Sequence, residues 1–188
     1  MSRNIFRATV TAAKDKMMRA LQVLIRGEET RDNLEHMEPY GFTSEPFTDG
    51  ATDALVVFLD DDKAHGIVVN VADRRYRIQS LEQGEVCIYD DKGHKIHLKR
   101  SELLIDGASD PVNVTTSGDI TATAGGDITL TASGTITMNA STVQINAPVS
   151  STAGITASGD VVGGSISLDT HTHSGVQSGS SNTGTPNS

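Results

Sequence analysis

The chain has 188 residues and a formal net charge of −9; all 15 Lys and Arg lie within residues 1–107, whereas residues 108–188 contain five Asp and no base. An acidic chain without a basic cluster argues against a nucleic-acid partner. No apolar run approaches the roughly 20 residues of a membrane span, and the amino terminus lacks the apolar segment of a signal peptide, so we expect synthesis in the cytoplasm.

The first half predicts a small antiparallel β domain. Short β-rich segments alternate there with turn signals such as the aspartate runs at 60–62 and 90–91. Five or six such strands are enough for a small barrel. Residues 4–20, with apolar side chains near helical spacing, are expected to form an amphipathic helix. The predicted strands are Leu21–Arg26, Ala54–Leu59, Gly66–Val71, Glu85–Tyr89 and Lys95–Lys99.

Residues that could carry catalysis are scarce in this half. Cys87 lies in a strand-like segment and is expected to be a small buried apolar side chain rather than a nucleophile. His94 and His97 are expected on opposite faces as solvated hairpin residues, not as a metal pair. The aspartate runs could hold a metal but are more typical of turns. No catalytic motif is present, so we do not expect an enzyme.

An eight-residue repeat follows the last Lys or Arg and the last aromatic residue of the chain. Around each repeat apolar residues alternate with Thr or Asn, which predicts short strands of about five residues joined by turns. The last aromatic residue is Tyr89. The repeated positions are Gly118, Gly126 and Gly134, and Ile120, Ile128 and Ile136.

Two inward apolar residues on so short a strand cannot form a core within one chain. Three chains wound about one axis would bury these residues together, place Thr outside and leave no open sheet edge along the shaft. A monomeric Thr-rich solenoid is the alternative. Calcium-binding nonapeptide repeats fit less well because the period here is eight.

A His-Thr-His motif follows the repeat. Side chains two residues apart in an extended strand point to the same face, so His171 and His173 would project together. Three chains would supply six imidazoles, which suit an octahedral transition metal better than tetrahedral zinc. The simpler alternative is an exposed motif in a Ser- and Gly-rich tail. Asp160 and Asp169 are candidate Ca²⁺ ligands on the same axis, and the sequence leaves that cofactor open.

Several segments resemble the Mu-type baseplate spike proteins of contractile-tail phages and tailocins. In the first half these include Tyr40-Gly41-Phe42-Thr43-Ser44 and Asp73-Arg74-Arg75-Tyr76-Arg77, and near the end His171-Thr172-His173-Ser174-Gly175-Val176. The resemblance implies an OB-fold-like barrel docked on the baseplate hub and a trimeric β-helix that pierces the bacterial outer membrane when the sheath contracts. It also implies Fe²⁺ held by His171 and His173 at the apex, in a particle-borne protein at the baseplate tip.

The expected architecture is therefore all-β, with an OB-fold-like barrel followed by an intertwined trimeric β-helix and a metal-tied apex. We expect an extension at 1–20, a hub-docking domain at 21–107, the β-helix at 108–170, and the apex with its tail at 171–188. A trimeric fibre that binds a cell-surface glycan is the alternative function, although it would need aromatic residues that the tail lacks. A cell-wall hydrolase spike would need a catalytic domain, for which residues 100–117 are too short.

Overall fold

The computed structural model describes residues 4–59, 65–172, 175 and 179. The chain divides into two compact units, Met1–Ile120 and Thr121–Ser188. The described residues contain strands and turns but no helix, so the all-β prediction is confirmed, and none of them forms a helix that could cross a membrane.

His173 and the aspartate run at 60–62 lie outside the described residues. The predicted domain boundary at residue 108 stays a prediction.

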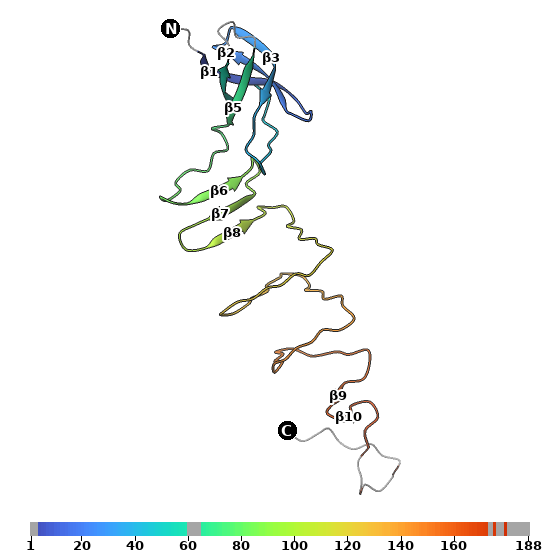
Figure 1. Cartoon of the computed structure of the whole chain (residues 1–188). Coiled ribbons are helices and arrows are strands. Elements are labelled where there is room, and N and C mark those ends of the chain that lie inside the picture. Colours follow the sequence, from blue (N-terminus) through green and yellow to red (C-terminus); the bar gives the residue numbers. More distant parts are fainter. Residues whose placement is uncertain (1–3, 60–64, 173–174, 176–178, 180–188) are drawn as a thin grey trace. The chain divides into compact units, whose positions relative to one another are not determined.

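Five strands close into a barrel at the amino-terminal end (Figure 1). Their order is β1-β2-β3-β5-β4, and all neighbours are antiparallel except β3 and β5, which pair in parallel at Glu35–Ile67 and His36–Val68. Closure leaves no unpaired edge, and it confirms the small barrel expected from the sequence. The strands are β1 (Ile5–Lys14), β2 (Ala20–Ile25), β3 (Glu29–His36), β4 (Asp53–Phe58) and β5 (Gly66–Ala72).

The barrel core is built from alternate residues of each strand. In β1, for example, Phe6, Ala8 and Val10 are buried while their neighbours face outward. The rings of Phe6 and Phe58 meet edge to face, with centroids 5.7 Å apart, in the geometry that aromatic pairs prefer. The buried apolar residues that pack together in this core are Phe6, Ala8, Val10, Leu21, Val23, Ile25, Leu34, Ala54, Val56, Phe58 and Val68.

The helix expected over residues 4–20 is wrong. Residues 5–14 form β1, which pairs with β2 on one side and β4 on the other. The alternation of Phe6, Ala8 and Val10 therefore outweighs the helical spacing of Phe6, Val10 and Met17, and Met17 is exposed. The barrel consequently starts before residue 21, at which we had expected the domain to begin.

Gly66 opens β5 at a point where no side chain would fit. A Cβ atom there would lie 2.7 Å from Cε1 of Phe58 and 2.9 Å from Cδ2 of Leu34. Both neighbours belong to the core, so they cannot move aside without opening it. The glycine therefore allows the backbone of β5 to pack directly against two core side chains.

A second, three-stranded antiparallel sheet follows the barrel, with β7 in the centre (Figure 1). It consists of β6 (Val86–Tyr89), β7 (Lys95–Leu98) and β8 (Leu103–Asp106). The sequence predicted β6 and β7 but not β8. The pairs Ile88–Ile96 and Ile96–Ile105 stand directly opposite each other across the strands.

The repeat region forms no paired strand in the single chain. Between Asp106 and Val162, the described residues adopt turns and extended segments, and the next strands are β9 (Val162–Gly163) and β10 (Ile166–Ser167). Ile120, Ile128 and Ile136 are 68%, 60% and 51% exposed. The intertwined β-helix thus stays a prediction, and the repeated apolar side chains have no core within one chain.

Candidate functional site

The segment before the His-Thr-His motif forms a small corner of its own. β9 and β10 pair at Gly163–Ile166 and Val162–Ser167, with Gly164 at a φ of 67° in the turn. The amide of Leu168 donates to the carbonyl of Val161. These bonds fix the path of the chain up to the motif, so His171 begins from a defined backbone position.

Ser167 orients His171. The His171 amide donates to the Ser167 carbonyl at 3.2 Å, and ring nitrogen Nδ1 lies 2.9 Å from the same oxygen. A carbonyl oxygen only accepts, so Nδ1 must carry the proton in this contact. In the neutral ring Nε2 then holds the lone pair, which is the arrangement found when a histidine coordinates a metal through Nε2.

Asp160 and Asp169, the candidate Ca²⁺ ligands, contact each other through the backbone. Oδ1 of Asp160 accepts a hydrogen bond from the Asp169 amide at 3.1 Å. The hydrogen bond with Ser167, followed by those from backbone amides, lowers the pKa of Asp160. The carboxylate of Asp160 thus closes the corner locally.

A complete metal site is not present in the part of one chain that the structure describes. No group of three or more His, Cys, Asp or Glu side chains there could hold an ion. His171 brings one imidazole with a suitable tautomer, and His173 lies outside the described residues. A site with six imidazoles would therefore require the motif of three chains.

Two histidines of the three-stranded sheet differ from expectation. His97 is buried rather than solvated, and its Nε2 lies 3.2 Å from Oε2 of Glu85. His94 stands between two carboxylates, with Nδ1 at 2.6 Å from Asp90 and Nε2 at 3.0 Å from Asp110. The hydrogen bond with Asp90 is the main cause that raises the pKa of His94. The negative charges of Asp90 and Asp110 raise it further, whereas desolvation lowers it in part. Each histidine thus contacts carboxylates of the segments that flank the strands.

Cys87 is half-buried rather than buried. Its Sγ lies 3.8 Å from the carbonyl oxygen of Ile88. This contact is to a backbone carbonyl oxygen, and the role of Cys87 as a packing residue stays a prediction.

Arg75 organises a cluster that the sequence did not predict as a unit. Its guanidinium binds the carboxylates of Asp49 and Asp73 and lies 5.4 Å and 5.2 Å from the ring centroids of Phe47 and Tyr76, which stack on each other. The hydrogen bonds from Arg75 lower the pKa of Asp73 to about 2. The cluster ties the loop before β4 to the segment after β5.

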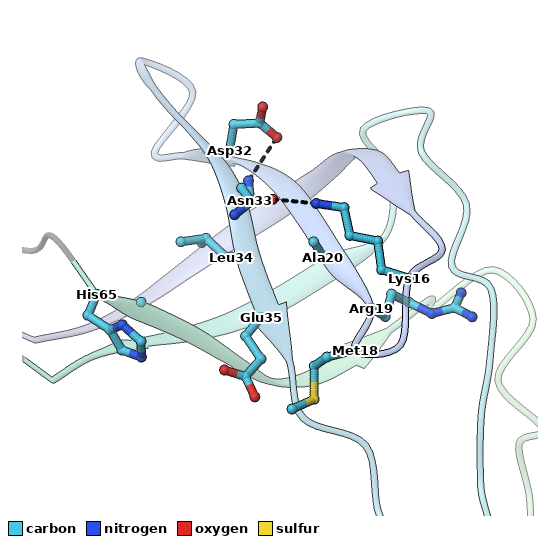
Figure 2. A pocket seen from close by; sticks show the side chains of 10 residues that line it. Lys16, Met18, Arg19, Ala20, Asp32, Asn33, Leu34, Glu35 and His65 are labelled. Atoms are coloured by element: carbon cyan, nitrogen blue, oxygen red, sulfur yellow. Dashed lines mark hydrogen bonds between the residues drawn. The ribbon is translucent and has the colours of Figure 1, made fainter.

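A polar pocket of about 460 Å³ lies beside the barrel, between the β1–β2 turn, β3 and the start of β5 (Figure 2). Lys16 donates to the side-chain oxygen of Asn33, and Asp32 accepts from the Asn33 amide and from Lys14. His65, which lies much later in the sequence than Asp32 and Asn33, lines the same pocket. The two lysines, Asp32 and Asn33 are thus engaged in surface ion pairs and amide contacts, and the residues that line the pocket include no Ser, Thr or Cys that could act as a nucleophile.

Comparison with known proteins finds matches at both ends of the chain. Residues 7–75 match the family model of the N-terminal part of bacteriophage Mu Gp45, and residues 165–187 match the GpV apex motif. The first match covers the barrel strands from Arg7 onward and the Arg75 cluster except for Tyr76. The second covers β10 and the His-Thr-His motif.

Two curated relatives agree with these matches. The baseplate puncturing device gp45 of Escherichia phage Mu is 36% identical over 95 residues, which are 50% of this chain and 47% of that protein. The Mu-like prophage FluMu protein gp45 of Haemophilus influenzae is 32% identical over 95 residues, 50% of each chain. The chain thus spans about half the length of the curated relatives it matches. The match to the Mu Gp45 N-terminal model in the barrel and the match to the GpV apex motif near the end confirm the predicted resemblance of this chain to Mu-type baseplate spike proteins.

Proposed function

We propose that this protein is the central, cell-puncturing spike of a contractile-tail baseplate. The observation that carries the proposal is the order of its parts. A barrel of the Mu Gp45 type comes first, a repeat with exposed aliphatic residues follows, and an apex motif comes near the end. The name of the phage Mu relative, a baseplate puncturing device, supports the same role.

The barrel is the proposed attachment to the baseplate hub. Five strands in a closed barrel agree with the OB-fold-like domain expected from the resemblance. Its exposed loop carries Tyr40 and Phe42, 105% and 59% exposed, which are aromatic side chains suited to a protein contact. The Arg75 cluster fixes the far end of the same loop.

The repeat is the proposed shaft, formed by three copies of the chain. Ile128 and Leu130, 60% and 65% exposed, have no core in one chain, and burial of such residues is the main favourable term in assembly. Thr and Ser on the opposite positions would keep the shaft narrow. Interchain pairing would also satisfy the backbone groups that no strand pairs in the single chain.

The apex is the proposed metal site. His171 and His173 from three chains would hold one Fe²⁺ through six imidazoles, and Ser167 supports this by fixing the tautomer of His171. The bound ion would tie the three chain ends together. The role is mechanical: sheath contraction would supply the energy to pierce the outer membrane, and catalysis by the chain is not required.

The proposal is tested on the full-length, tag-free protein. Light scattering coupled to size-exclusion chromatography should give the mass of three chains, and elemental analysis of the same peak should give iron. Negative-stain images should show a rod with one thick end. A monomer that is folded throughout would contradict the spike and favour the monomeric solenoid.

A further inference from the structure

The three-stranded sheet exposes an apolar face. Because residues directly opposite each other in neighbouring strands share a face, the pairing places six aliphatic side chains in two rows across β6, β7 and β8. Each is between 41% and 64% exposed. We call this surface the aliphatic face; its rows are Val86–Leu98–Leu103 and Ile88–Ile96–Ile105.

The other face of the sheet is the more buried one, although it carries polar groups. Its central residue, His97, is buried and contacts Glu85, and its neighbours Cys87 and Leu104 are half-buried. An antiparallel sheet normally places its apolar face on the core and its polar face in water. Here the fully aliphatic face is the uncovered one. Six adjoining side chains amount to an apolar patch on the order of 500 Å², at the upper end of what soluble monomers expose.

The chain after β8 extends this face. A Cβ atom on Gly107 would lie 2.7 Å from Cγ2 of Val112 and 2.8 Å from the carbonyl oxygen of Asp110, so glycine permits a tight corner. His94 holds that corner through Asp110. As a result Val112 and Pro111 line a groove of about 420 Å³ together with Ile88, Ile96 and Ile105.

The charges around the aliphatic face are already paired within the chain. Lys95 binds Asp106 at 2.8 Å, Lys99 binds Glu102 at 2.6 Å, and Lys92 lies 3.6 Å from Asp110. The two rows contain no charged or polar side chain. The surface therefore does not select a charged partner. Copies of a chain with a net charge of −9 could meet at this face without bringing like charges into the contact.

The spacing of the face along the chain points to the same occupant as the shaft. Ile88 and Ile96 are eight residues apart and Ile96 and Ile105 nine, close to the eight-residue period of Ile120, Ile128 and Ile136. The same residue type at nearly the same period is exposed in both regions. A surface that continues the pattern of an interchain contact is most simply covered by the same neighbours.

We propose that the aliphatic face packs against the same face of two further copies of this chain, so that the trimer contact begins at residue 86 rather than in the repeat. This inference rests on the proposed trimeric spike and extends its interface. It covers the aliphatic face of the sheet that follows the barrel in the sequence, and it explains why the sheet leaves this face open in a single chain.

Cross-linking in the full-length protein tests the inference. Ile96→Cys is made in a Cys87→Ser background and treated with a short bismaleimide. The controls are the wild-type protein, whose Cys87 lies on the opposite face of the same sheet, and Leu55→Cys in the same background. Leu55 is 41% exposed, as is Ile96, but lies in the barrel strand β4. Only the Ile96→Cys protein should form covalent dimers.

A charge on the face gives the second measurement. Ile96→Asp should raise the protein concentration at which half of the chains are trimeric by at least about tenfold, because a buried unpaired carboxylate is unfavourable. Leu55→Asp should leave that concentration unchanged. A wild-type trimer with no cross-link at position 96 and no difference between the two Asp variants would overturn this inference and leave the spike intact. A monomeric wild-type protein would overturn both.

Discussion

Ile96 and His97 are neighbours in β7 and lie on opposite faces of the three-stranded sheet, Ile96 41% exposed and His97 only 9%. The imidazole of His97 contacts Glu85 on the more buried face, whereas Ile96 stands in the centre of the aliphatic face. In a chain that functioned alone, the two side chains would be expected in the reverse positions. The trimer contact proposed above would cover Ile96 and so account for this arrangement.

The first prediction concerns the repeat. Ile128→Asp should abolish the trimer, because three carboxylates would enter the shaft and each would cost roughly several kcal/mol if left unpaired. Sedimentation velocity and circular dichroism of the full-length protein are the measurements. Thr129→Asp is the matched control, since alternation places residue 129 on the outer face. Loss of the trimer in the control alone would show that the two faces are assigned the wrong way round.

How far the sequence predicts the fold depends on the strand. β4 and β5 are rich in Val and alternate between buried and exposed positions, so they were predictable. β3, with the sequence ETRDNLEH, was not, because only Leu34 and His36 are buried and its place in the barrel is set by pairing with β2 and β5. Tertiary pairing outweighs local propensity in such a strand.

The candidate site, too, could be predicted from the sequence only in part. The His-Thr-His motif was visible because two like residues at a spacing of two share a face in a strand. The bond from His171 to Ser167 was not, since it depends on the turn between β9 and β10. The Arg75 cluster was missed because Asp49 is 26 residues away from Arg75 in the chain and only the closed barrel brings them together.

The second prediction concerns Asp73 and Arg75. In Arg75→Gln the pKa of Asp73, held at about 2 by hydrogen bonds from Arg75, should rise toward its ordinary 3.8. Because the folded-state pKa is lowered, the stabilisation is complete above pH 3.8 and is lost as the pH falls toward 2. Carboxyl chemical shifts followed by NMR during an acid titration measure this.

Arg74→Gln is the control for that titration. Arg74 lies 3.1 Å from Asp53 and is the adjacent residue of like charge. Its removal should leave the pKa of Asp73 low. An equal rise in both variants would mean that general positive charge, rather than the bonds from Arg75, holds Asp73 ionised.

The third prediction concerns the His94 contact with Asp110. The folded state favours protonated His94, whose ordinary pKa is 6.5, because Asp90 and Asp110 accept from its ring. This contribution to the free energy of unfolding is therefore complete below pH 6.5 and is lost as the pH rises through the elevated folded-state value. The wild-type protein should accordingly be more stable at pH 5.5 than His94→Gln, with a smaller difference at pH 8.5. Urea unfolding at the two pH values provides the comparison, and a pH-independent difference would contradict it.

The last prediction concerns the apex metal. Tag-free protein should contain about one iron per three chains, because an octahedral ion uses all six imidazoles that three copies of His171 and His173 supply. The double variant His171→Ala, His173→Ala should lose the iron and remain a trimer, since the burial proposed for the shaft does not involve the apex. His94→Gln is the matched control and should keep its iron, because His94 is occupied by Asp90 and Asp110 in the sheet. Iron that persists in the double variant would contradict the proposed apex metal site. So would a wild-type trimer that contains no iron although it was purified in the presence of iron. The trimeric shaft would then be tested by the mass of the protein alone.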